Sequence, residues 1–440
     1  MKNFLGALIF AFLFITVSGQ KAKHVILISI DGFRPDFYLD SSWKADNIRS
    51  LMPTGIYALR VNSVFPSLTY PSHTTIITGV LPAKHGIFYN APFLSPAKKD
   101  SIYWKFSTIQ STTLWELLKK KGLKSAAIKW PVSAGAPVDY IIPDVGKVGV
   151  KTYNYSLPHG IIEEINREVF SNMGSDLTFF QNHDDINSAK ILCYLIKNYK
   201  LDFMAIHLMG VDHAEHLEGR DGKLVKINVL LADQAVGMIL KSIKEAGIES
   251  STCVIVTGDH GFKSVNTEVN PNVWLKAKGF QVSTSEDEGR TYFYPAGGSA
   301  FLYVQHKNRK RTIRNITKLL AELPSNERQY FSVISKKNII KAGADPKACL
   351  ALTAKNGAVF GSQTEGDAII KKNSTSGAHG YFPDSEGIQT GFVANGAGIE
   401  SGLVIKQMAL TDIAPFITDL LGINFPHLSS KVNFMSQFLK

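Results

Sequence analysis

Several apolar runs of strand length end directly at residues that can bind metals, and this feature restricts the fold more than any other. The first run, His24–Ile30, is nearly continuous and ends at Asp31. Runs of this kind are typical of parallel strands that are buried on both faces of a sheet. Further runs of the same kind are Ser125–Ile128, Phe203–Leu208 and the residues 253–257 and 390–394.

Segments with helical period alternate with these runs. Residues 111–121 and 225–246 are predicted helices, the second ending at Gly247, and a shorter helix is expected to begin near Thr74. Residues 408–421 are expected to form a closing C-terminal helix. Strands that alternate with helices predict an α/β fold, with a mostly parallel sheet between two layers of helices. In open α/β sheets the site lies outside the carboxyl ends of the strands, so residues far apart in sequence can meet there.

A long stretch between His260 and His379 does not continue this pattern. It contains Gly297-Gly298, a short strand at 300–304, a basic helix and a polar run at 371–376. Because the residues on both sides of it are expected to meet in one site, the stretch should leave the sheet and return to it. We therefore expect one catalytic domain, residues 20–440, with an inserted smaller cap subdomain at roughly 266–375.

The N-terminus has the layout of a secretory signal peptide, predicted as residues 1–19. Lys2 precedes an apolar stretch at 4–17, and the small residues Ser18 and Gly19 follow, which places cleavage before Gln20. The apolar stretch is too short for a spanning helix, although an uncleaved anchor is the alternative. We expect an exported protein, periplasmic or secreted, with no membrane span after cleavage.

The chain carries a formal net charge of +11, with basic clusters at 119–121 and 307–314. Such clusters are usually solvated helix faces, and no nucleic-acid-binding motif accompanies them. The excess charge is compatible with anionic substrates and indicates nothing more specific. The 45% apolar content is that of an ordinary globular core.

Three segments supply metal-ligand types after predicted strands. Asp259-His260 follows the run at 253–257, and a carboxylate beside an imidazole suits Zn²⁺, although such pairs are also common in ordinary loops. Asp212 and His216 are four residues apart, so both side chains share one face if this segment is helical. His379 has small neighbours that allow close backbone approach, but taken alone it could be purely structural.

Thr69 is the candidate nucleophile. It is expected just ahead of a helix N-terminus, where backbone N–H groups favour an anion. A hydroxyl held on a metal at such a place can attack as an alkoxide. The alternative is a threonine that serves only as a cap or turn residue.

At these positions the chain resembles the nucleotide pyrophosphatase/phosphodiesterase family, the type I phosphodiesterases of the alkaline phosphatase superfamily. The resemblance runs over nearly the whole chain after the N-terminal apolar stretch. The matching strings are Ser29-Ile30-Asp31-Gly32-Phe33-Arg34, Phe65-Pro66-Ser67-Leu68-Thr69-Tyr70-Pro71-Ser72-His73, Thr78-Gly79, His85-Gly86-Ile87 with Asn90, Gly210-Val211-Asp212 with His216, Thr257-Gly258-Asp259-His260-Gly261, His379-Gly380 and Asp412-Ile413-Ala414-Pro415.

The resemblance implies an alkaline-phosphatase-like fold and a metal-dependent phosphoric diester hydrolase with two Zn²⁺ ions. The first ion would be held by Asp31, Asp259, His260 and the Thr69 oxygen, and the second by Asp212, His216 and His379. Two ions about 4 Å apart can clamp the attacking and leaving oxygens of an in-line displacement.

The same resemblance assigns Thr69 as the nucleophile that forms a phosphothreonine intermediate, and Asn90 as a hydrogen-bond donor to a phosphoryl oxygen. Tyr70 and Tyr153 would sandwich a nucleobase, which favours a small nucleotide or phosphodiester substrate. Trp130-Pro131 resembles a family motif, but the residues after it depart from the family pattern, which leaves the substrate pocket open. Because the resemblance covers the catalytic domain alone, we expect a minimal catalytic domain, as in secreted bacterial relatives.

Three alternatives stay open, because one metal site serves several chemistries in this superfamily. The first is a phosphate-scavenging phosphomonoesterase or phosphonate hydrolase, and the second is a lipid or choline phosphodiesterase. The third is a cell-envelope binding protein with a degenerate site, although no ligand position is missing. An aromatic residue, Tyr70, follows Thr69 where a monoester specialist would need a cation, which favours diesters.

Overall fold

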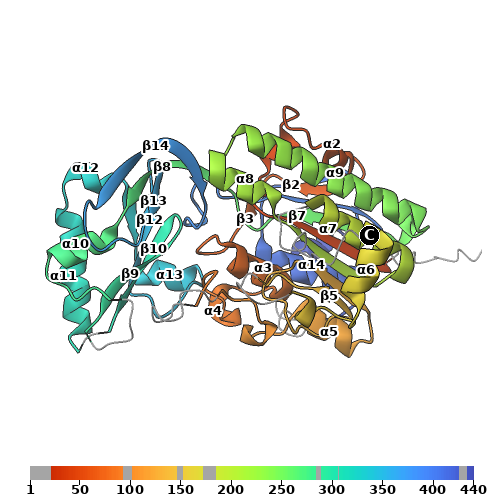
Figure 1. Cartoon of the computed structure of the whole chain (residues 1–440), viewed down its shortest axis with the longest axis horizontal. Coiled ribbons are helices and arrows are strands. Elements are labelled where there is room, and N and C mark those ends of the chain that lie inside the picture. The colour runs from red at the N-terminus through yellow and green to blue at the C-terminus, as the bar shows by residue number, and fades with distance from the viewer. Residues whose placement is uncertain are drawn as a thin grey trace, which may run out of the picture.

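The computed structural model describes residues 21–92, 102–145, 152–171, 185–283, 289–305, 307–425 and 434–440, and of Tyr153 and Phe434 it describes only the backbone. Two lobes lie side by side: a larger one around a long central sheet and a smaller one with sheets of its own (Figure 1). The predicted signal peptide, residues 1–19, lies outside the described residues.

The larger lobe contains an eight-stranded sheet in the order β16-β2-β15-β7-β1-β6-β4-β5. The strands from β7 to the edge strand β5, namely β7, β1, β6, β4 and β5, are parallel, whereas β15 is antiparallel to both of its neighbours. The strands are β1 (His24–Ile30), β2 (Ile56–Ala58), β4 (Ser125–Ile128), β5 (Tyr140–Ile142), β6 (Phe203–Leu208), β7 (Thr252–Thr257), β15 (Phe392–Gly396) and β16 (Leu403–Ile405). A separate pair is formed by β3 (Val61–Asn62) and β17 (Met408–Ala409).

Helices cover both faces of this sheet (Figure 1). One face packs on α2 (Asp46–Ser50), α6 (Ile161–Phe170), α7 (Asp185–Tyr199) and α9 (Lys223–Glu245). The other packs on α3 (Thr69–Thr78), α5 (Leu114–Lys120) and α14 (Ile413–Leu420). The remaining elements of this lobe are α1 (Asp36–Leu39), α4 (Pro82–His85), α8 (Gly210–Glu218), η2 (Phe106–Thr108), η3 (Thr152–Tyr155), η5 (Glu249–Ser251), η6 (Leu410–Asp412) and η7 (Phe434–Phe438).

The continuous apolar character of β1 follows from its place between these layers. Ile26 and Ile28 contribute to the core beneath α7 and α9, whereas Val25 and Leu27 contribute to the core beneath α3, α5 and α14. Because successive side chains of a strand point to opposite faces, a strand covered on both sides needs apolar residues at every position. The prediction of an α/β fold with a mostly parallel sheet is confirmed.

The smaller lobe is formed mainly by the chain between β7 and β15. It has an antiparallel sheet in the order β11-β12-β10-β9 and a three-stranded sheet in the order β13-β8-β14 around a shared apolar core. Its elements are β8 (Lys263–Val269), α10 (Pro271–Ala277), β9 (Thr291–Ala296), β10 (Ser299–Val304), α11 (Arg309–Glu322), α12 (Ser325–Arg328), β11 (Phe331–Ile334), α13 (Lys336–Lys341), β12 (Leu350–Ala354), β13 (Ala358–Phe360) and β14 (Ile369–Ala378).

Two predicted helices begin elsewhere in the structure. The segment 408–421 starts with β17 and η6, and its helix α14 begins only at Ile413 because Met408 and Ala409 pair with β3. The helix expected near Thr74 is α3, which begins at Thr69. Pro71 lies in its first turn, where a helix uses no N–H donor, so the proline does not delay the start.

Among the described residues, no helix combines the length and the apolar character that crossing a bilayer requires.

Candidate active site

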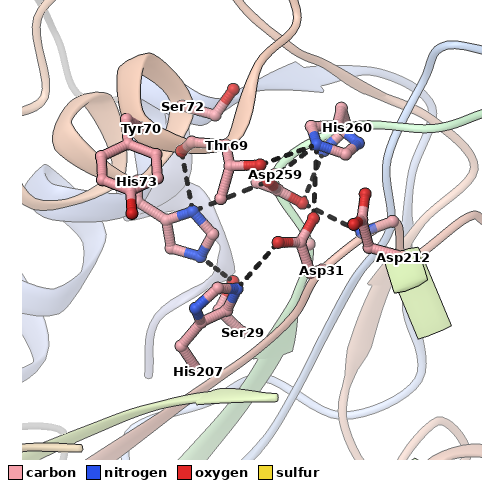
Figure 2. A network of polar contacts seen from close by, with 12 residues as sticks. Ser29, Asp31, Thr69, Tyr70, Ser72, His73, His207, Asp212, Asp259 and His260 are labelled. Carbon is pink, nitrogen blue, oxygen red and sulfur yellow. Dashed lines mark hydrogen bonds and ion pairs between the residues drawn. The ribbon is translucent and has the colours of Figure 1, made fainter. Parts of the chain in front are cut away.

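The carboxyl ends of three neighbouring strands bring the first group of candidate residues together. β1 pairs in parallel with β6 on one side and β7 on the other. Asp31 follows β1, Asp259 and His260 follow β7, and α8 follows β6 with Asp212 in its first turn. Figure 2 shows Asp31, Asp259 and His260 converging with Asp212 in front of α3. The location predicted from the strand ends is therefore the one observed.

Three oxygen atoms surround one nitrogen of His260. Its Nε2 atom lies 3.3 Å from Thr69 Oγ1, 3.3 Å from Asp31 Oδ1 and 3.1 Å from Asp259 Oδ2 (Figure 2). A ring nitrogen carries a single proton or a single lone pair, so it cannot satisfy three oxygens. Asp31 Oδ1 and Asp259 Oδ2 are buried and accept no hydrogen bond among the described residues. A cation among these four atoms would satisfy all of them at once.

A second group lies beside the first. Asp212 Oδ1 is 3.5 Å from His216 Nε2 and 3.7 Å from His379 Nε2. The His379 ring also stacks on the His260 ring, with centroids 3.7 Å apart, so the two groups are in contact. The ligand atoms of Asp212, His216 and His379 all lie within 4.8 Å of one another.

Asp212 occupies a position between the two groups. Its carboxylate is also within 4.8 Å of the ligand atoms of Asp31 and His260. The division implied by the resemblance placed Asp212 with the second ion alone, whereas the geometry allows its carboxylate to reach both. Asp259 keeps its short contact to His260 in the first group.

Burial and mutual repulsion make the three carboxylates costly to ionise without a cation. Burial, with repulsion from Asp212, holds the pKa of Asp31 well above its usual range. Burial also raises the pKa of Asp259, with Asp31 adding to the shift, and that of Asp212, with Asp259 adding to it. A divalent ion reverses this balance because it stabilises the charged carboxylates.

The imidazoles of the second group are oriented for metal binding by their other ring nitrogens. His216 Nδ1 lies 3.1 Å from the carbonyl of Gly377, and His379 Nδ1 lies 2.9 Å from the carbonyl of Ser67. A carbonyl only accepts, so each Nδ1 carries the proton and each Nε2 presents its lone pair to Asp212. Burial lowers the pKa of both rings, that of His379 to about 3, which keeps them neutral.

Close approach of two backbones allows His379 to reach this site. β14 passes α8 at Gly377, where a Cβ atom would lie 2.1 Å from the carbonyl oxygen of Glu215. Only glycine leaves room there, which is the physical basis for the small residues before His379.

Thr69 is the first residue of α3, and a chain of hydrogen bonds through His73 and Ser29 holds its backbone. His73, one turn later, donates from Nδ1 to the Thr69 carbonyl at 2.9 Å. The hydroxyl of Ser29 on β1 lies 2.9 Å from the other ring nitrogen of His73 and donates to it. This chain of bonds ties the start of α3 to the central sheet (Figure 2). The Thr69 hydroxyl consequently faces the ring nitrogen of His260 and the carboxylates of the first group.

His207 belongs to the site although no prediction included it. It lies on β6, opposite Ser29 in register; its Nε2 lies 3.1 Å from Asp31 Oδ2 and its Nδ1 lies 3.3 Å from the carbonyl of Lys129. The contact with Asp31 uses one carboxylate oxygen and turns the other toward His260. A histidine inside the apolar run Phe203–Leu208 was the available signal, because a buried polar side chain needs a partner.

Asn90 and Tyr70 lie at the edge of the site. The backbone N–H of Tyr70 donates to Asn90 Oδ1 at 3.1 Å, and the Tyr70 hydroxyl donates to Asp144 at 2.8 Å. Because the amide oxygen of Asn90 is the acceptor, its NH₂ group is the part left to donate to a ligand. The side chain of Tyr153 lies outside the described residues, so the aromatic sandwich stays a prediction.

The chain matches a family of known proteins over most of its length. Residues 25–382 match the family model described as type I phosphodiesterase / nucleotide pyrophosphatase. Ectonucleotide pyrophosphatase/phosphodiesterase family member 3 from Rattus norvegicus is 23% identical over 425 residues, which cover 91% of this chain and 42% of that protein. A venom phosphodiesterase from Macrovipera lebetinus is 23% identical, with coverage of 92% and 44%. The chain thus spans less than half the length of the curated relatives it matches.

Solved structures show the same fold. Murine ectonucleotide pyrophosphatase / phosphodiesterase 5, an inactive variant in complex with AMP, superposes with a TM-score of 0.67 and 19% identity over 96% of this chain and 100% of that one. The human counterpart gives a TM-score of 0.66 and 18% identity, with coverage of 95% and 100%. At this level of sequence identity, the structural similarity is evidence for the fold alone.

Proposed function

The chain belongs to the type I phosphodiesterase / nucleotide pyrophosphatase family, and on that premise we propose that it is a di-zinc hydrolase that cleaves phosphodiester or pyrophosphate bonds of nucleotides. The observation that carries this proposal is the convergence of Thr69, Asp31 and Asp259 oxygens on His260 Nε2. A nucleophilic hydroxyl, two carboxylates and an imidazole form a donor set suited to Zn²⁺.

The residues that would hold the ions are those of the two contact groups. Asp31, Thr69, Asp259 and His260 would hold one ion, while His216 and His379 would hold the other, with Asp212 within reach of both. When bound, Zn²⁺ supplies Lewis-acid stabilisation of the charge on the attacking and leaving oxygens.

The reaction proposed for Thr69 has two displacement steps. Its Oγ1 attacks phosphorus, the bond between phosphorus and the leaving oxygen breaks, and the hydroxyl proton ends on the leaving group. The product is a phosphothreonine that still carries the nucleoside as a second ester. Water then breaks the bond between phosphorus and Oγ1, which restores the hydroxyl and releases the nucleotide. The placement of Thr69 at the start of α3, with its hydroxyl oxygen 3.3 Å from His260 Nε2, supports this role. Asn90 would donate from its NH₂ group to a phosphoryl oxygen.

The substrate class can be tested by comparing two aryl esters. We expect the purified protein to hydrolyse an aryl nucleotide diester faster than an aryl phosphate monoester, because Tyr70 rather than a cation follows the nucleophile. Chelation should abolish the activity and Zn²⁺ should restore it. Preferred cleavage of the monoester would instead support a phosphomonoesterase on the same site, and zinc-independent activity would contradict the metal assignment.

His379 provides a test of the metal count. We expect His379→Ala to lose about one of two zinc equivalents, because His379 Nε2 is one of three donors in the second group. Elemental analysis after dialysis measures this directly. The matched control is His213→Ala, on the same helix as His216 but outside both contact groups, which should keep both ions. Retention of both ions in His379→Ala would remove His379 from the ligand set.

Export and domain organisation belong to the same proposal. We propose that residues 1–19 direct export, which agrees with venom phosphodiesterases among the relatives, and that residues 266–375 form the core of a cap. The relatives' names support nucleotide or phosphodiester substrates over lipid or choline esters.

A further inference from the structure

The smaller lobe packs against Tyr89, the residue that precedes Asn90. Tyr89 is 2% exposed, and its ring packs against Tyr294 of β9, with centroids 4.6 Å apart, and edge-on against Phe301 of β10, at 5.3 Å. These residues share one apolar cluster at the junction of the lobes. The loop of the larger lobe that carries Asn90 is therefore anchored in the β-sheet of the other lobe.

A directional chain of hydrogen bonds continues from Tyr89 into the smaller lobe. The Tyr303 hydroxyl donates to Asp345 Oδ2 at 2.5 Å, because a carboxylate can only accept. Its single proton is then used, so in the 2.5 Å contact with Tyr89 the Tyr89 hydroxyl must be the donor. Asp345 also accepts from the backbone N–H of Lys347 at 2.8 Å. Linked donors of this kind polarise one another and strengthen each bond.

The chemical state of the two phenols agrees with this direction. Burial raises the pKa of Tyr89 and of Tyr303 well above the usual range, with Asp345 adding to both shifts. Both hydroxyls therefore keep the proton that they donate. Asp345 and Tyr303 are themselves buried, at 5% and 6% exposure, so solvent does not compete for these bonds.

Asn90 is held on its remaining sides by the larger lobe. Its backbone carbonyl accepts from Tyr103 N at 2.9 Å, and its Oδ1 accepts from Tyr70 N at 3.1 Å. The second bond fixes which end of the amide faces outward. Tyr89 is joined to Asn90 by a peptide bond, so the contacts of Tyr89 with the smaller lobe also restrain the position of Asn90.

From these contacts we infer that Tyr89, Tyr303 and Asp345 position Asn90, so that residues of the smaller lobe act on catalysis through a donor that the larger lobe carries. This inference rests on the proposed function, in which the NH₂ group of Asn90 meets a phosphoryl oxygen. A donor of that kind has to be held within a fraction of an ångström to favour the transition state. Loosening its anchor should lower kcat and leave substrate binding and the metal site nearly unchanged.

The test is a double-mutant cycle on the full protein with the aryl nucleotide diester. Tyr89→Phe keeps the packed ring and removes one hydrogen bond, and we expect kcat to fall about 3- to 10-fold with KM within about 2-fold and unchanged zinc content. Asn90→Ala should lower kcat by about 10- to 100-fold. In the Asn90→Ala background, Tyr89→Phe should cause no further loss, because Tyr89 acts through Asn90.

The control is Tyr38→Phe, which removes another buried tyrosine hydroxyl, one that donates to the Ala58 carbonyl and accepts from the backbone N–H of Phe392 in the larger lobe. It should cost at least as much thermal stability and leave kcat unchanged. Asp345→Asn keeps the side-chain size and should repeat the Tyr89→Phe result if that variant folds poorly. Equal losses from Tyr89→Phe with and without Asn90, or no loss at all, would overturn the inference while the diester activity of the wild type stands. A wild type that cleaves no diester would refute the proposed function instead.

Discussion

Replacing Thr69 by alanine should abolish turnover, with kcat for the aryl nucleotide diester at least about 1,000-fold below wild type. The hydroxyl is the atom at the start of α3 that faces His260 Nε2, and alanine supplies no nucleophile there. Asp31, Asp259 and His260 are untouched, so at least most of the zinc should remain bound. Steady-state kinetics and elemental analysis on the same preparation separate these two outcomes.

Thr69→Ser is the matched control, since it keeps a hydroxyl at the same position. We expect it to retain a measurable part of the activity, through an intermediate that carries the nucleotidyl group on the serine oxygen. Thr317→Ala, at an exposed position of α11, should behave as wild type. Activity near the wild-type value in Thr69→Ala would show that another group attacks phosphorus.

Replacing Arg34 by alanine should destabilise the larger lobe by about 3–5 kcal/mol, because the change leaves the buried Glu215 without its partner. Both side chains are fully buried, and Arg34 Nε lies 3.3 Å from Glu215 Oε1. The guanidinium also lies 3.2 Å from Asp36 and packs over the ring of Phe37. Burial raises the pKa of Glu215, and Arg34 opposes that shift, so its loss favours a protonated or displaced Glu215.

The effect should extend to the metal site, because Glu215 lies on α8 between Asp212 and His216. Urea unfolding measures the loss of stability, and zinc titration should show weaker binding at the second group. The comparison is Arg167→Ala, whose ion pair with Glu168 at 2.8 Å is largely exposed, so its loss should leave the free energy of unfolding nearly unchanged. A change below about 1 kcal/mol in Arg34→Ala would mean that the lobe relaxes to rehydrate Glu215.

The predicted strands agree well with the structure because their pattern is local. β1, β4 and β6 have the predicted bounds, and β7 begins one residue earlier. A strand buried on both faces needs an unbroken apolar run, and its end is visible as a change to polar residues such as Asp31. The strand predicted at 390–394 lies at Phe392–Gly396 and is antiparallel to β7, a direction that no local pattern specifies.

The candidate ligands were also recognisable, since their chemical types follow strand ends at family-like spacing. What the sequence pattern did not indicate is how they are held. His207 orients Asp31, and Ser29 with His73 holds Thr69. These partners are ordinary residues of buried segments, and only the register between β1 and β6 brings His207 to Asp31.

The sequence by itself determined the local elements and the identity of the ligand-type residues, because both depend on neighbours within a few positions. The tertiary structure alone decided which of these side chains share a contact. It placed Asp212 between the two groups and joined Tyr89 to Tyr303 and Asp345 across 214 and 256 residues of chain. Such contacts depend on how whole lobes pack against each other. That packing is determined by the free energy of the complete chain, so it cannot be predicted from any short segment.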